Sequence, residues 1–116
     1  CLYAPQKFVE ANPNVVQALT NAMVRADKWI QKAGVDEIVK VVPESYLLGD
    51  PTVYKAAIAK SMEGLSPDGL IPDDGAATAV KALAAFSAEF DAGKIDPAKA
   101  WTNDFARRAN EKYPNV

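Results

Sequence analysis

The strongest hydrophobic pattern in the chain runs from about Pro13 to Ala33 and repeats with the period of a helix. On an ideal helical wheel its apolar residues fall within an arc of about 140°. They are Val15, Val16, Leu19, Ala22, Met23, Ala26, Trp29, Ile30 and Ala33. The other side is polar, so the pattern predicts a helix about 30 Å long whose apolar face is buried.

Similar but weaker patterns predict four further helical segments. They cover about 36–41, 51–63, 73–91 and 97–113, and the last breaks near residue 101, where Thr102 can begin a new helix. Residues 44–49 and 65–71 are expected to be loop or single turns, because turn-forming pairs such as Asp68-Gly69 interrupt the pattern. No stretch alternates with a period of two, so we expect an all-α chain of about five helices with little or no strand.

Prolines and glycines indicate where these helices begin and end. Three prolines follow a residue whose side chain can cap a helix, in the pairs Asn12-Pro13, Asp50-Pro51 and Asp96-Pro97. Pro5 and Pro72 are expected to play the same role in the first turn of a helix, and after Pro72 the carboxylates of Asp73 and Asp74 complement the helix dipole. Three glycines follow periodic stretches and are expected to take left-handed positions at helix ends: Gly34, Gly64 and Gly93.

Length and composition fit one helical segment and exclude several kinds of chemistry. The chain has 116 residues, a formal charge of −2 and 49% apolar residues, which is typical of a folded domain and gives no basic surface for nucleic acid. It has no histidine and one cysteine, which excludes imidazole catalysis, histidine metal sites and an internal disulfide. No phosphate-binding glycine loop is present, and we expect no cofactor, no metal and no enzymatic activity.

The charged candidates have simpler structural interpretations. Asp68, Asp73 and Asp74 do not have the spacing of a calcium loop, and adjacent carboxylates at a helix start favour its dipole. Arg107 and Arg108 can hold an anion, but at this spacing from acidic neighbours they are expected to form surface ion pairs. The lysines at 55, 60 and 81 are expected to be solvated.

The remaining candidates are aromatic or nucleophilic. Trp29 and Trp101 can serve as ligand platforms, but their places on amphipathic faces favour core packing. No serine lies in a G-x-S-x-G turn; the serines considered are Ser45, Ser61, Ser66 and Ser87. Nothing near Cys1 in the sequence lowers its pKa. We therefore expect no catalytic residue.

The first residues allow three interpretations. Cys1 is the lipidated first residue of a bacterial lipoprotein, or the first residue after a removed signal peptide, or a point inside a structural element of a longer protein. The apolar residues Leu2, Tyr3 and Ala4 favour the third, since a lipoprotein anchor is usually followed by a polar tether.

The order of segments resembles a known family. Phe8-Val-Glu-Ala-Asn-Pro13 leads into the long helix, followed by a link with Pro43 and the Asp50-Pro51 helix start. Then come Asp68-Gly-Leu-Ile71, an Ala/Phe-rich helix before Gly93-Lys-Ile-Asp96, and Trp101-Thr-Asn-Asp-Phe105. Over essentially the whole chain this resembles the C-terminal part of solute-binding proteins of ABC importers, in the nitrate, sulfonate, taurine and thiamine-precursor branch.

That resemblance implies a two-lobed α/β protein of about 300 residues that clamps a small ligand by hinge closure. It implies a periplasmic protein, or an exported, membrane-associated one in an organism without a periplasm, whose partner is the ABC permease. The ligand would be a small organic or inorganic anion or a related metabolite. Most of the family's ligand contacts lie upstream of this region, so the ligand-binding residues stay unknown. Tyr3 is the nearest candidate by position.

Other interpretations remain open. A stand-alone helical module that binds a partner helix in a groove is the main alternative. A small enzyme is the least favoured. If the chain is a helical layer from a larger protein, its apolar face is exposed when it is isolated, and we expect the piece alone to associate with itself. A clean monomer in light scattering at high concentration would contradict that expectation.

Overall fold

The computed structural model describes residues 1–47 and 49–116, and within these residues every regular element is helical. The order is α1 (Gln6–Ala11), α2 (Pro13–Lys32), α3 (Val35–Val41), η1 (Glu44–Tyr46), α4 (Pro51–Ser61), η2 (Met62–Gly64), α5 (Asp73–Phe86), η3 (Ala92–Lys94), α6 (Pro97–Ala100) and α7 (Asp104–Lys112). The elements named η are short 3₁₀ turns. The described part of the chain contains no strand, which confirms the all-α prediction.

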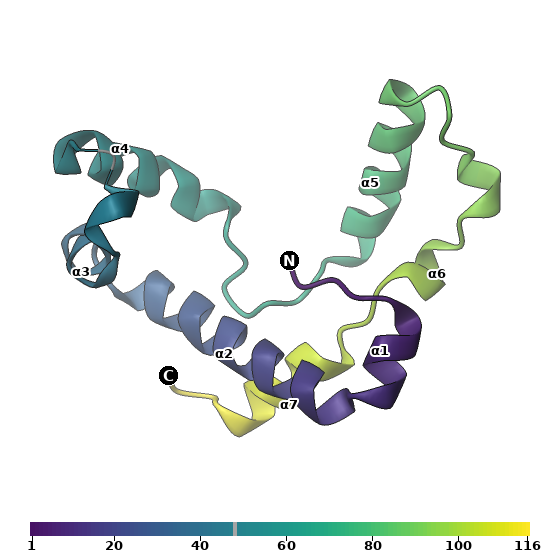
Figure 1. Cartoon of the computed structure of the whole chain (residues 1–116), viewed down its shortest axis with the longest axis horizontal. Helices are drawn as coiled ribbons and strands as arrows, with labels where there is room; N and C mark the ends of the chain where they lie inside the picture. Colours follow the sequence, from purple (N-terminus) through teal and green to yellow (C-terminus); the bar gives the residue numbers. More distant parts are fainter. Residues whose placement is uncertain (48) are drawn as a thin grey trace.

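The helices form a base with two arms. In Figure 1, α2 and α7 lie along the base, α3 and α4 form one arm, and α5 rises on the other side. The first residues of the chain lie between the arms in that view. The radius of gyration is 17.0 Å, whereas a compact domain of this length has one of about 13 Å. The chain is therefore far more open than a typical single domain.

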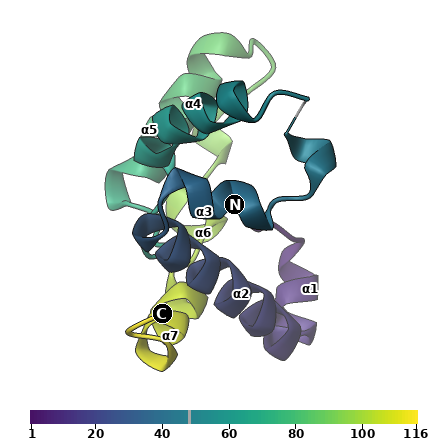
Figure 2. The ribbon, with the colours of Figure 1, turned by 90° about the vertical axis from the view of Figure 1, so that its left-hand side faces the viewer.

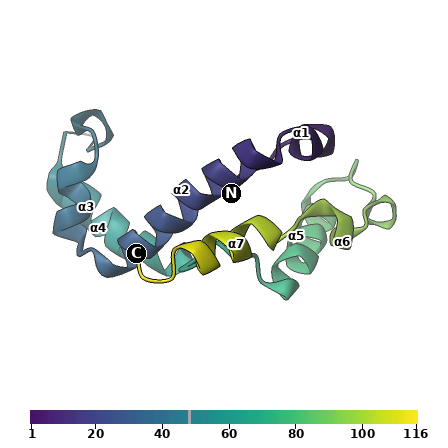
Figure 3. The same cartoon turned by 90° about the horizontal axis from the view of Figure 1, so that it is seen from below.

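Helices α2 and α7 pack side by side and run in the same direction (Figure 3). Gln17, near the start of α2, contacts Phe105 of α7, and Lys28, eleven residues further on, contacts Tyr113. Between them Val24 is 1% exposed and packs with Ala106 and Ala109. This small core, together with Leu70 from the loop after η2, is what joins the two ends of the chain.

The buried side of α2 is opposite to the predicted one. The residues facing α7 lie on the mainly polar side of the helix, around Gln17, Val24 and Lys28. Val15, Leu19 and Met23, which belong to the predicted buried face, are about half exposed. The prediction of a helix at 13–33 is confirmed, but the prediction that this chain buries its apolar face is wrong. The reason is that α7 supplies small alanines and polar groups, which fit the polar side of α2.

The arm formed by α3 and α4 is held by one buried side chain and one ion pair. Ile38 is buried, and Lys55 Nζ of α4 lies 2.6 Å from Asp36 Oδ1 of α3. Figure 2 shows this arm in front of the more distant α5. Residues 44–46 form a single 3₁₀ turn, within the predicted loop or turn. Leu48, in the same predicted segment, lies outside the described residues.

Two of the three predicted caps form as expected. The carboxylate of Asp50 accepts hydrogen bonds from the backbone N–H groups of Thr52 and Val53, and that of Asp96 accepts one from Ala98. Asn12 does not cap α2 with its side chain. Its amide instead donates to the carbonyl of Phe8, because Asn12 also ends α1, a short helix whose N-cap residue is Pro5.

The prediction that Gly34, Gly64 and Gly93 take left-handed positions at helix ends is wrong. Gly34 has φ −70° and ψ 160°, so it is extended and precedes α3 rather than closing α2 in a left-handed turn. Within the described residues the positive φ angles of glycine occur at Gly49 and Gly69. Neither Gly64 nor Gly93 is among them. Helix α2 ends at Lys32, and its C-cap residue Ala33 is extended, so no glycine is needed there.

Helix α5 is shorter than the predicted segment 73–91. It ends at Phe86, and Ser87 is extended, with a turn closed by the Phe90 N–H on the Ser87 carbonyl. Glu89 and Asp91 would lie in the last turn of a longer helix, where negative charge is unfavourable. The final segment also differs slightly, since α7 is preceded by Asn103, while the hydroxyl of Thr102 accepts the Asp104 N–H.

Candidate functional site

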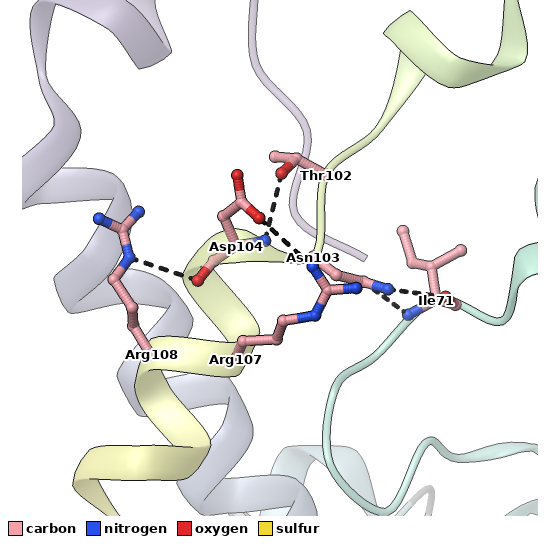
Figure 4. A network of polar contacts seen from close by, with 6 residues as sticks. All are labelled: Ile71, Thr102, Asn103, Asp104, Arg107 and Arg108. Atoms are coloured by element: carbon pink, nitrogen blue, oxygen red, sulfur yellow. Dashed lines mark hydrogen bonds and ion pairs between the residues drawn. The ribbon is translucent and has the colours of Figure 1, made fainter.

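The most connected part of the molecule is the junction where the loop 65–72 crosses between α2 and α7. Asn103 is its central residue and is only 7% exposed. Its side-chain amide donates to the carbonyl of Ile71, and its side-chain oxygen accepts the N–H of the same residue, both at 2.9 Å (Figure 4). One side chain thus satisfies both backbone groups of a loop residue 32 positions earlier.

The loop is also bound by Asn110 and by its own side chains. Asn110 donates to the carbonyl of Asp68 at 2.9 Å and to that of Ala106. The Asp68 carboxylate accepts from the Leu70 N–H, and the Ser66 hydroxyl accepts from the Gly69 N–H. Asp68 and Ser66, two of the candidates for chemistry, therefore shape the loop, as side chains of this type do in turns.

Gly69 is the point where the loop comes closest to α2. Its φ is +73°, and a Cβ atom added there would lie 2.8 Å from Cγ2 of Val24. An L-residue is unfavourable at this φ, and the contact is shorter than carbon atoms tolerate. Glycine is required at this position by both the backbone angle and the close approach.

Two polar side chains of α2 bind the backbone of the C-terminal segment. Gln17 donates to the carbonyl of Phe105 at 2.9 Å, and Lys28 donates to the carbonyl of Tyr113 at 2.6 Å. Arg25 lies over the ring of Tyr113, 5.1 Å from its centre. Within the described residues, Oε1 of Gln17 is buried without a hydrogen-bond partner.

Asp27 is the carboxyl of this junction whose titration is perturbed. Burial raises the pKa of Asp27, the positive amino terminus opposes that rise, and the carboxylate of Asp68 adds to it. A raised pKa in a cleft marks a candidate catalytic acid. Here Oδ2 of Asp27 lies 3.7 Å from the position of a Cβ on Gly69, so this carboxyl lies against the loop.

Arg107 and Arg108 lie at the surface beside Asp104, as expected. Arg107 pairs with the Asp104 carboxylate at 3.5 Å, and Arg108 donates to the Asp104 carbonyl (Figure 4). The guanidinium of Arg108 also lies over the ring of Phe105. These three residues line an open depression of about 360 Å³. Because all three project from one helix and the arginines already have partners, the depression lacks the converging groups of a ligand site.

The other candidates are scattered. Asp73 and Asp74 lie in the first turn of α5, as predicted. Trp29 is 37% exposed, so it is not the core residue that the pattern predicted, whereas Trp101 is half-buried. Tyr3 and Cys1 are exposed at the start of the chain. The other serines and lysines considered lie outside the junction. Lys55, which pairs with Asp36, lies in α4 with Lys60 and Ser61, while Ser45 is in η1, Lys81 is in α5 and Ser87 follows α5.

The described residues contain no group of three or more histidine, cysteine, aspartate or glutamate side chains placed to hold a metal ion. None of their helices is both long enough and apolar enough to cross a membrane.

Asn103, Asn110 and Gln17, which bind the junction together, were not predicted from the sequence. Their signal in the sequence was weak, because amides on helices are ordinary surface residues and their partners are backbone groups up to 88 positions away. Only Asp68-Gly69 gave a local signal, as a turn pair. The junction as a whole is suited to holding the chain's shape.

No family model and no curated protein matches this chain. A solved structure of a protein from Bordetella bronchiseptica RB50 is similar, with 81% sequence identity and a TM-score of 0.96. The match covers 99% of this chain but only 36% of the Bordetella chain. This chain therefore spans about a third of the length of that protein, which is about 320 residues long because 99% of 116 residues amounts to 36% of it.

Proposed function

We propose that these residues belong to the solute-binding component of an ABC importer, which captures a small anion or related metabolite and delivers it to a membrane permease. The solute would be of the nitrate, sulfonate or taurine kind, and the protein would be periplasmic, or exported and membrane-associated. It would not be an enzyme and would need no cofactor.

The observation that carries this proposal is the size of the similar solved protein. A helical segment with 81% identity makes up 36% of a chain of about 320 residues. That length agrees with the two-lobed protein of about 300 residues that the resemblance implies. The open, two-armed shape of this segment is in keeping with a part that surrounds other structure rather than a domain with its own ligand pocket.

The described junction also favours binding over catalysis. Its side chains form hydrogen bonds to backbone groups. Asp27, the carboxyl of the junction whose pKa is raised, faces the loop. In the proposal, the ligand is held mainly by residues outside this segment, and the segment supplies a rigid support. The junction of α2, α7 and the loop 65–72 would keep that support in shape while the lobes close around the solute.

The test is a thermal-shift screen of the full-length gene product against nitrate, taurine, short alkanesulfonates and pyrimidine precursors of thiamine. A ligand at about 100 times its Kd stabilises the folded state by about 2.7 kcal/mol, which raises Tm by several degrees. Neutral sugars serve as the control panel and should leave Tm unchanged. The proposal fails if the intact mass of the gene product is that of 116 residues alone, or if no solute of the class raises Tm.

A stand-alone helical interaction module is the second candidate, and the exposed apolar face of α2 is the observation that favours it. In that case the gene product would be short, and a partner helix would cover the face. The intact-mass measurement separates the two candidates, because the importer component requires the longer chain.

A further inference from the structure

A stripe on the apolar face of α2 is left about half exposed by the described chain. Val15, Leu19 and Met23 are spaced four residues apart, and their exposed fractions are 49%, 51% and 44%. On the helix Val15 and Leu19 lie roughly opposite Val24, which is the residue buried against α7, and Met23 lies about 100° away from it. The stripe is therefore not part of the core that this chain makes for itself.

Other helices of the described chain also carry large apolar side chains that are exposed. Phe8 of α1, Val53 of α4 and Leu83 of α5 are all well exposed, and Phe86 at the end of α5 is 92% exposed. The total accessible area is 8716 Å², whereas a compact monomer of this mass exposes about 6,100 Å². The excess of about 2,600 Å² is several times the roughly 800 Å² that one partner buries in a standard interface.

The similar Bordetella structure shows that the open shape occurs within a longer chain. Over 99% of this sequence the two structures agree with a TM-score of 0.96, so the arms are held apart in the same way there. About 200 residues of that chain lie outside the matched part, since the match covers 36% of about 320. A folded body of that size is large enough to cover the excess area.

We propose that the exposed apolar faces of α2, α4 and α5 are an internal docking surface, covered by about 200 further residues of the same polypeptide. That body presents an apolar surface to Val15, Leu19 and Met23, and the arms flank it. A second copy is a poorer fit, because one standard interface would leave about two thirds of the excess exposed.

The experiment measures thiol accessibility in the full-length gene product. Leu19→Cys places a thiol on the apolar stripe, and Lys32→Cys places a matched thiol on the polar side of the same helix. Each protein is treated with N-ethylmaleimide in native buffer and in urea, and peptide mapping by mass spectrometry reads each position separately. Met23→Cys repeats the measurement with a smaller change of side chain, in case Leu19→Cys disturbs folding.

We expect the thiol at 19 or 23 to react at least about 100-fold more slowly than the thiol at 32 in native buffer, and equally fast in urea. The ratio should not change over a roughly hundredfold dilution, because the covering body belongs to the same chain. Native rates equal to that of the control would overturn the inference. Protection that disappears on dilution would overturn it too, because it would assign the cover to a second copy or a separate partner.

This inference does not depend on the transport function proposed above. Protection of the stripe in a protein that binds none of the screened solutes would keep the docking surface and reject the importer. Solute binding together with freely reactive thiols on the stripe would keep the importer and reject the docking surface.

Discussion

Replacing Gly69 with alanine should destabilise the protein by about 3 kcal/mol, through two separable causes. The first is the left-handed backbone, since an L-residue at φ +73° loses about 1–2 kcal/mol. The second is the new methyl group, placed 2.8 Å from Cγ2 of Val24. Val24 is 1% exposed, so it has no free space to move into, and overpacking of this kind costs about 1–3 kcal/mol.

Gly49 provides the matched control. Its φ is +79°, but a Cβ there has no neighbour within 4 Å. Gly49→Ala therefore carries the backbone penalty alone, and the difference between the two variants isolates the contact with Val24. Urea denaturation of the full-length protein, followed by far-ultraviolet circular dichroism, gives both free energies of unfolding.

A double-mutant cycle with Val24→Ala tests the assignment further, because it removes the methyl group that the new Cβ meets. In that background Gly69→Ala should lose only the backbone penalty, so the coupling free energy should be about 1–3 kcal/mol. Equal losses at Gly69 and Gly49, or a coupling near zero, would refute the close approach as a cause.

Three other substitutions test the remaining features. Asn103→Ala should destabilise by about 2–4 kcal/mol in urea denaturation, because it leaves both backbone groups of Ile71 buried without partners; a loss below that of an exposed alanine substitution would contradict this. Asp50→Ala should lower stability by about 1 kcal/mol and reduce helix content by circular dichroism, because its carboxylate caps α4; an unchanged unfolding midpoint would reject the cap. Asp27→Asn should stabilise the protein at pH 7 and lose that advantage below pH 3.8, the ordinary pKa of the group. The folded state raises the pKa of Asp27, so the charged form opposes folding and its effect grows as pH rises above that value; urea midpoints at both pH values check the sign.

Local features of this fold were predictable from the sequence because they depend on neighbouring residues. The helix at 13–32 follows from its periodicity, and the caps at Asp50 and Asp96 follow from an acidic residue before proline. Asp73 and Asp74 lie in the first turn of α5 for an equally local reason, the preference of carboxylates for that end of a helix.

The orientation of α2 was not predictable in this way. A wheel shows which side of a helix is apolar, but it does not show whether the partner of that side lies within the chain. Here α7 uses Ala106 and Ala109 to pack beside Val24, on the side that carries Gln17 and Lys28. The role of Asn103 was not predictable either, because its partners are the backbone groups of Ile71, which lies 32 residues earlier in the chain.

The distance along the chain between α2 and α7 bears on how the protein is made. Helix α2 ends at Lys32, and its partner α7 begins at Asp104. At about 5–20 residues per second, the ribosome needs roughly 4–14 s after completing α2 to reach the first residue of α7. During that interval each arm can form from residues close in sequence, but the base cannot close. The nascent chain therefore carries α2 with its α7-facing side uncovered for several seconds, which is long enough for a chaperone to bind that side before α7 is synthesised.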